Sequence, residues 1–135
     1  MTVLYLDSSA VVKLVSREPE TADLIRVVRA DPSVISSALA WTEVVRAVRR
    51  VRGNTARAEG VLSGIALVPI DGGIVRSAAT LAPTSLRTLD AIHVATALSL
   101  GADVSQLVTY DDRLAGAATD AGIEVITPGS VSKST

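Results

Sequence analysis

Four acidic residues lie where apolar segments begin or end, which is where side chains of α/β proteins often do chemistry. Asp7 and Asp111 close the runs "TVLYLD" and "QLVTYD", each with the apolar pattern of a buried strand. Glu43 and Asp90 lie in the expected first turns of the helix-like segments "SALAWTEVVRAVRRVR" and "TLDAIHVATAL". Asp111 is preferred to its neighbour Asp112 because it directly ends its run, although either residue can contribute.

Clustered carboxylates of this kind predict a particular chemistry. They repel one another in a crevice unless cations offset their charge, and oxygen-only ligand sets favour Mg²⁺ or Mn²⁺ over zinc or copper. Two such ions can activate a water and stabilise a leaving oxygen at phosphorus, which points to phosphodiester hydrolysis. Because the acids are dozens of residues apart, spacing alone does not establish that they meet.

The elements that must position these acids alternate between short strands and helices. Such alternation predicts an α/β fold with a parallel sheet and helices on both faces, whose ligand site lies beyond the carboxyl ends of the strands where strand order reverses. We expect Ser8 and Ser9 to cap the first helix, Pro19 to begin the second, "DP" at 31–32 to end it and Gly53 to end the third. The expected strands cover residues 2–7, 33–36, 65–70, 106–111 and 123–127.

Composition limits the other possibilities. A chain of 135 residues, 48% hydrophobic but only 2% aromatic, fits one domain with an aliphatic core, and residues 129–135 look like a flexible tail. The absence of cysteine excludes disulfides and thiolate sites. We find no signal peptide or run of about 18 apolar residues, so we expect a soluble, cytoplasmic protein.

Four blocks in order, "YLDSSAVVKL", "WTEVVRAV", "LRTLDAIHVATAL" and "LVTYDDRLAGAA", resemble the signature blocks of PIN-domain ribonucleases, most closely the VapC-type toxins of bacterial type II toxin-antitoxin systems. The resemblance runs over nearly the whole chain. It implies a three-layer fold around a mostly parallel five-stranded sheet, metal-dependent endonucleolytic cleavage of RNA, and a homodimer held inactive by a cognate antitoxin.

Residue by residue, the resemblance implies an acidic centre that holds Mg²⁺ or Mn²⁺. The matching positions are Asp7, Glu43, Asp90 and Asp111, with the hydroxyls of Ser8 and Thr109 in supporting roles. The resemblance leaves open whether Asp111 or its neighbour Asp112 contributes.

Simpler roles compete with these assignments. Glu43 has Arg46 three residues on, so a surface ion pair would explain it, while Arg46 and Arg50 share its side and are candidate contacts to RNA phosphates. For His93, the only histidine, we expect hydrogen bonds within the core rather than a ligand or base role. Trp41 heads a stripe with Val44, Val45, Val48 and Val51 that predicts core packing, with a dimer or antitoxin surface as the alternative.

Rival functions are weaker. A signalling receiver needs a lysine on a late strand, and the only lysines are Lys13 and Lys133. A phosphatase of the haloacid dehalogenase type needs a second aspartate where Ser9 stands. A catalytically silent PIN-like module that binds RNA or protein remains open, because sequence does not show metal binding.

Overall fold

A parallel sheet forms the middle layer of the structure. The computed structural model describes residues 2–30 and 33–130, and within them five parallel strands lie in the order β3-β2-β1-β4-β5. Their bounds are β1 Val3–Leu6, β2 Val34–Ser37, β3 Ala66–Val68, β4 Val104–Val108 and β5 Val125–Ile126. The strand order reverses between β1 and β4, so a crevice is expected where these two neighbours end.

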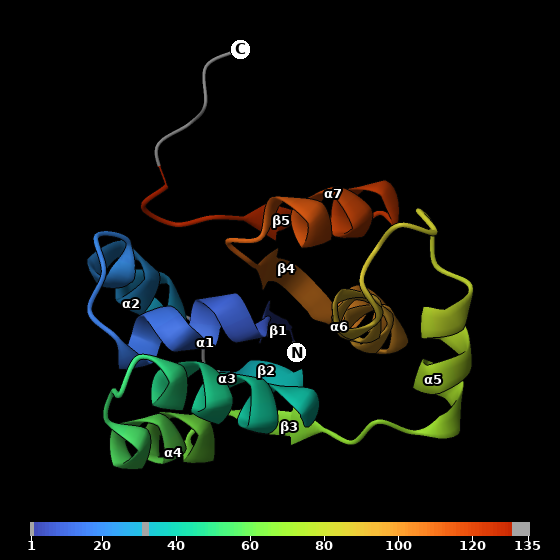
Figure 1. Ribbon diagram of the computed structural model, residues 1–135. Helices are drawn as coiled ribbons and strands as arrows, with labels where there is room; N and C mark the ends of the chain where they lie inside the picture. The colour runs from blue at the N-terminus through green and yellow to red at the C-terminus, as the bar shows by residue number, and fades with distance from the viewer. Residues whose placement is uncertain (1, 31–32, 131–135) are drawn as a thin grey trace.

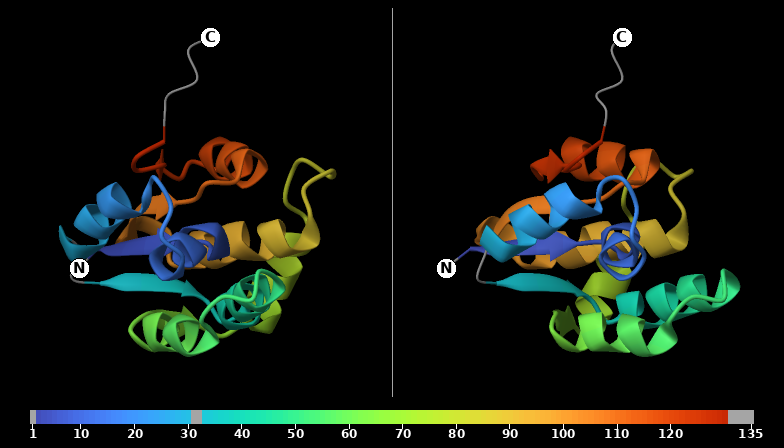
Figure 2. Two further views of the ribbon diagram at one scale, coloured as in Figure 1. Left: turned by 60° about the vertical axis from the view of Figure 1, so that its left-hand side comes forward. Right: turned by 90° about the vertical axis from the view of Figure 1, so that its left-hand side faces the viewer.

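Helices cover both faces of this sheet (Figures 1 and 2). The first four helices pack on one face, α6 and α7 on the other, and α5 packs against the outside of α6. This arrangement confirms the predicted three-layer α/β fold. The bounds are α1 Ser8–Val15, α2 Thr21–Ala30, α3 Leu39–Arg50, α4 Thr55–Ser63, α5 Gly72–Ala79, α6 Thr88–Ser99 and α7 Asp112–Asp120.

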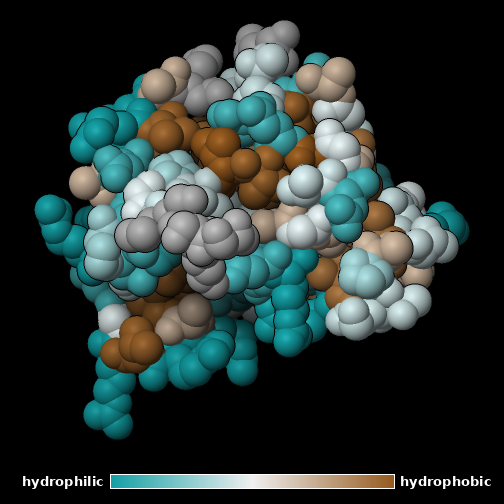
Figure 3. Space-filling view, turned by 90° about the horizontal axis from the view of Figure 1, so that it is seen from above, coloured by the Kyte–Doolittle hydropathy of each residue, from teal (hydrophilic) through white to brown (hydrophobic). Residues whose placement is uncertain are grey.

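Alternation along β1 divides the core between these faces. Leu4 and Leu6 pack beneath the first four helices, whereas Tyr5 points to the other face, against α6 and α7. Successive side chains of a strand point to opposite faces, so one short strand anchors both halves of the core. The outer surface over α7 mixes hydrophilic and hydrophobic side chains (Figure 3).

Several local predictions need correction. Strand β4 ends at Val108, so Asp111 does not end the strand but stands before α7 as its N-cap. The N-cap of α1 is Asp7 rather than Ser8 or Ser9, because an aspartate in extended backbone accepts the free amide of the first turn. Glu43 is the fifth residue of α3, which begins at Leu39, so it lies just beyond the first turn and not within it as predicted.

Helix boundaries differ in two further places. Helix α2 begins at Thr21, whose hydroxyl accepts the backbone N–H of Glu18, and not at Pro19. Helix α3 ends before Gly53, with Arg52 in the left-handed conformation at φ 55° and the N–H of Gly53 bonded to the carbonyl of Val48 at 2.8 Å. The glycine therefore follows the left-handed residue, where a Cβ would lie 2.9 Å from the Val48 side chain.

The expected core stripe of α3 is only partly buried. Val44 and Val48 are fully buried, but Trp41 is 38% and Val51 72% exposed. The prediction of core packing is thus wrong for the two ends of the stripe, which lie in the first turn of α3 and at its C-cap.

The predicted break at 31–32 lies outside the described residues, as does the larger part, 131–135, of the tail predicted at 129–135. Ser130 is described, and its N–H bonds the carbonyl of Thr127. Across the described ranges, none of the helices has the length and apolar character needed to cross a membrane.

Candidate active site

Asp7 lies directly after β1, at the N-cap of α1. Its side chain is 3% exposed, and its Oδ1 accepts the Ala10 N–H at 3.0 Å and the Ser9 hydroxyl at 2.7 Å. Its Oδ2 accepts the hydroxyl of Thr109 at 2.5 Å. Burial outweighs these hydrogen bonds and raises the pKa of Asp7 above its ordinary value. A buried carboxylate held by three donors is rigidly oriented.

Thr109 joins the ends of the two central strands. While its hydroxyl donates to Asp7 from the segment after β4, its oxygen also accepts the backbone N–H of Asp111 at 3.0 Å. The sequence singled out Thr109 as a supporting hydroxyl, and this position places it between two of the predicted acids.

Glu43 projects from α3 toward α1 and α6. Its Oε1 accepts the Ser8 hydroxyl at 2.5 Å and lies 2.8 Å from Nε2 of His93. Burial opposes the charge of this carboxylate, but the hydrogen bonds from His93 and Ser8 together outweigh burial and hold the pKa of Glu43 below its ordinary value. Glu43 is therefore hydrogen-bonded to the histidine, which argues against the simpler pairing with Arg46.

His93 has hydrogen bonds at both ring nitrogens, as predicted. Nδ1 lies 2.9 Å from the hydroxyl of Tyr5, and Nε2 contacts Ser8 at 3.0 Å as well as Glu43. Because a carboxylate only accepts, Nε2 carries a proton and donates it to the Glu43 carboxylate. Burial raises the pKa of Tyr5, so this phenol stays protonated. The chain of contacts fixes the direction in which Glu43 points.

Asp90 and Asp111 meet through an arginine. Nε of Arg87 donates to Asp90 Oδ2 at 2.9 Å, and its NH2 group donates to Asp111 Oδ2 at 2.5 Å. The other oxygen of Asp111 accepts the backbone N–H groups of Arg113 and Leu114 at the start of α7. Asp90 and Asp111 raise the pKa of Arg87, so one permanent positive charge joins two acids that are far apart in sequence.

The four acids therefore reach one end of the sheet, but not as a single cluster. Within residues 2–30 and 33–130, no three acidic or histidine side chains lie close enough to bind one common metal ion. The expected convergence is corrected to three anchored units: Asp7 with Thr109, Glu43 with Ser8 and His93, and Asp90 with Asp111 through Arg87. The donors are carboxylate oxygens, and a cation already lies between two of them, so the set fits an oxygen-ligated divalent ion once Arg87 gives way.

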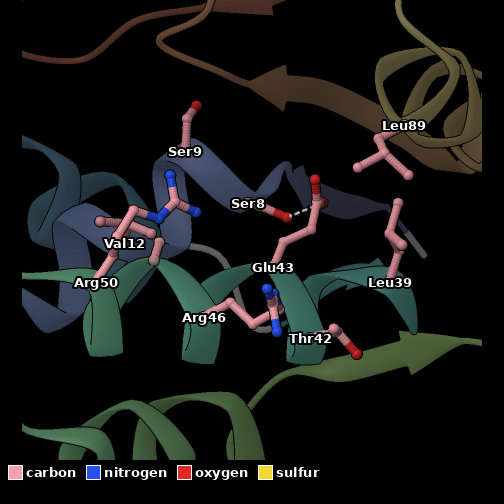
Figure 4. Close-up of a pocket in the computed structure, with 10 residues that line it drawn as sticks. Ser8, Ser9, Val12, Leu39, Thr42, Glu43, Arg46, Arg50 and Leu89 are labelled. Atoms are coloured by element: carbon pink, nitrogen blue, oxygen red, sulfur yellow. Dashed lines mark hydrogen bonds between the residues drawn. The ribbon is translucent and has the colours of Figure 1, made fainter.

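A groove runs from this site between α1 and α3 (Figure 4). Its volume is about 530 Å³, and its lining includes Ser8, Glu43, Arg46, Arg50 and Leu89. Both arginines are exposed on the side of α3 that carries Glu43, as predicted. The groove therefore places two positive charges beside Glu43, the one of the four predicted acids that lines it.

Sequence reasoning missed Arg87, the Ser9 hydroxyl and the contact of His93 with Glu43. Arg87 was detectable, because it lies three residues before Asp90, the spacing at which opposite charges meet at a helix start. Asp112, which the sequence left as an alternative to Asp111, is exposed as the first residue of α7.

The sequence also matches a family description, the PIN domain, over residues 4–119. The chain belongs to the PIN domain family. Ribonuclease VapC46 of Mycobacterium tuberculosis is 48% identical over 130 residues, covering 95% of this chain and 99% of that protein. Ribonuclease VapC47 of the same species is 35% identical over 135 residues, covering 96% and 99%. This PIN domain is therefore neither a receiver nor a haloacid dehalogenase-type phosphatase.

The fold of this PIN domain is also found in a solved structure. The crystal structure of Mycobacterium tuberculosis VapC20, described as a toxin that cleaves the sarcin-ricin loop, superimposes with a TM-score of 0.73. The superposition covers 93% of this chain and 99% of the VapC20 chain. The two sequences are 15% identical, so this likeness supports the fold alone.

Proposed function

We propose that this PIN domain is a Mg²⁺- or Mn²⁺-dependent endoribonuclease that acts as the toxin of a toxin-antitoxin module. The observation that carries the proposal is the placement of Asp7, Glu43, Asp90 and Asp111, from four separate segments, at the switch point of the sheet. Its relatives at 48% and 35% identity are named ribonucleases, which supports RNA as the substrate. Such a protein acts in the cytoplasm, where its RNA is found.

The reaction is hydrolysis at phosphorus. A water oxygen forms a bond to phosphorus while the bond to one ribose oxygen breaks, the water loses a proton to solvent and the leaving oxygen gains one. A bound divalent ion would lower the pKa of the attacking water and stabilise the charge on the leaving oxygen. Asp7, Glu43, Asp90 and Asp111 would hold the ion after their side chains move toward one another, because no three of them surround a common point among the described residues. Ser8, Thr109 and His93 keep two of these carboxylates oriented.

Adjacent acids offer a matched test of this assignment. Asp111→Asn is expected to lower metal-dependent cleavage of RNA about tenfold or more, because a carboxylate that faces Asp90 is lost. Asp112→Asn, which makes the same change one residue away on the exposed side of α7, should stay within about twofold of the original rate. Initial rates on one labelled RNA measure both. Equal losses in the two variants would contradict the assignment.

The groove suggests how RNA lies on the protein. We propose that Arg46 and Arg50 contact RNA phosphates, because both are exposed beside Glu43 on the same groove. Changing both to glutamine should lower the slope of log affinity against log salt by about 1.4, the loss expected for two contacts to single-stranded RNA. Binding in the presence of a chelator, which prevents cleavage, measures this slope. An unaltered slope would assign the two arginines to another surface.

The partners follow from the family resemblance. We propose a cognate antitoxin and a homodimer, for which the chain offers exposed apolar side chains on several elements: Trp41, Val51, Ile70, Val75 and Leu89. Leu89 also lines the groove, so an antitoxin bound there would block the path to the acids. Light scattering of the purified protein should give twice the mass of one chain, and a monomer at micromolar concentration would contradict the homodimer.

One observation favours the second candidate, a catalytically silent binding module. Arg87 already offsets one of the two negative charges of Asp90 and Asp111. A silent module would keep this ion pair permanently, whereas a nuclease must open it.

A further inference from the structure

Arg87 occupies an unusual place for a permanent charge. It is the N-cap residue of α6, its side chain makes no capping hydrogen bond, and the guanidinium instead reaches across to the N-cap of α7. Positive charge is disfavoured at a helix N-terminus, and here two helices begin. The carboxylates of Asp90 and Asp111 offset that cost.

The geometry of the contact is that of a bridge. One guanidinium donates through Nε to Asp90 and through NH2 to Asp111, so each carboxylate gives one oxygen to the same cation. The arginine side chain is 59% exposed, whereas Asp90 and Asp111 are 12% and 25% exposed. The two acids are therefore more buried than the cation, which lies on their solvent side and can leave in that direction.

The influence of this charge extends beyond the pair. Arg87 also contributes to the low pKa of Glu43, on the opposite side of the crevice, although less than His93 and Ser8 do. One side chain thus supplies positive charge to three of the four acids.

We infer that Arg87 is an internal counter-ion which holds Asp90 and Asp111 in place without metal, and which a divalent cation must displace in order to bind. This inference rests on the proposed metal-dependent function. It assigns to one residue, Arg87, the metal concentration that the chain requires for binding. Because the same two oxygens cannot serve both cations fully, metal and guanidinium compete. The half-exposed pair costs little to open, so metal at sufficient concentration wins.

The test is the affinity of the full chain for Mn²⁺ without RNA, measured by isothermal titration calorimetry at low ionic strength. Arg87→Gln removes the competitor and leaves two carboxylates repelling each other, so it should bind Mn²⁺ about fivefold more tightly than the original chain. Arg87→Lys should fall between the two, because an ammonium keeps the charge but lacks the planar fork that bridges two carboxylates.

A matched control is Arg26→Gln. Arg26 forms an exposed pair with Asp23 at the same three-residue spacing on α2, away from the crevice. The change removes the same charge but at a position away from Asp90 and Asp111. The Mn²⁺ affinity of Arg26→Gln should therefore equal that of the original chain. A gain in Arg26→Gln equal to that in Arg87→Gln would mean that net charge alone is responsible, which overturns the inference.

A second readout separates competition from general destabilisation. Without metal, Arg87→Gln should unfold at a lower urea concentration than the original chain, and saturating Mn²⁺ should close that gap because the ion replaces the lost charge. A gap that persists in Mn²⁺ would show a structural role only and would overturn the inference.

The inference and the proposed function fail in different ways. Equal Mn²⁺ affinity in Arg87→Gln and the original chain, or no Mn²⁺ binding by either, overturns the role of Arg87. Tighter Mn²⁺ binding by Arg87→Gln in a chain that cleaves no RNA would support the internal counter-ion and contradict the nuclease.

Discussion

Asp7→Asn is expected to lower RNA cleavage by about 100-fold or more while making the folded chain more stable at neutral pH. Activity falls because an amide does not supply the charge with which this carboxylate would hold a divalent ion. The cap of α1 survives, because the amide oxygen still accepts the N–H of Ala10 and the hydroxyl of Ser9. Stability rises because the folded state no longer holds a buried negative charge at the N-cap of α1.

The stability gain of Asp7→Asn should depend on pH, and the raised pKa of Asp7 determines whether the gain grows or falls as pH rises. Burial raises the pKa of Asp7 above 3.8 in the folded state, so the charged form is disfavoured there. Below pH 3.8 the carboxyl is protonated in both states, and the variant has no advantage. The advantage should grow as pH rises from 3.8 toward the raised folded-state pKa.

Urea unfolding of both proteins at several pH values measures this difference. Asp23→Asn, a change at an exposed carboxylate paired with Arg26, serves as the control and should show no comparable gain. Loss of stability in Asp7→Asn at pH 7, with cleavage retained, would mean that Asp7 is only a helix cap.

His93→Ala is expected to cost about 3 kcal/mol in the free energy of unfolding and to lower cleavage about tenfold in the protein that remains folded. The change opens a cavity in the core and leaves two groups, the Tyr5 hydroxyl and the Glu43 carboxylate, without their histidine partner. His93→Gln should recover part of both losses, because its amide nitrogen can donate to Glu43. Equilibrium urea unfolding and initial cleavage rates at 20–25 °C measure the two effects.

The neighbouring Val94 provides the control. It is fully buried on the same helix but packs in the apolar cluster against α7. Val94→Ala should therefore lose stability, by about 2 kcal/mol, and keep its cleavage rate. If cleavage fell equally in Val94→Ala and His93→Ala, the histidine would have no positioning role toward Glu43.

The residues at the strand ends were predictable because they obey short-range rules. Asp7 follows an apolar run and precedes a helical pattern, so its place at the sheet edge could be read from the sequence. The arginine bridge was not predictable in the same way, since it depends on α6 and α7 beginning side by side, which only the folded chain determines. The same limit explains Trp41, whose helical spacing indicates one face of α3 but not how much of that face the rest of the chain covers.

The contacts of His93 were predictable in one respect and not in another. A histidine in a helix that is apolar nearly all round predicts a hydrogen-bonded ring, and the structure confirms it. The identity of the partner, Glu43, required knowing that α3 and α6 approach the same end of the sheet. The family resemblance supplied the list of acids, but not the three separate units in which the structure holds them.

The most direct test of the central claim is cleavage of total cellular RNA by the purified chain, freed of any bound partner, with new RNA ends mapped by sequencing. Parallel reactions contain Mg²⁺, Mn²⁺ or a chelator, and Asp7→Asn is treated identically. Discrete new ends that require both metal and Asp7 are the predicted result. The same ends in the chelator, or no metal-dependent ends from a folded protein, would contradict a metal-dependent ribonuclease and favour the silent binding module.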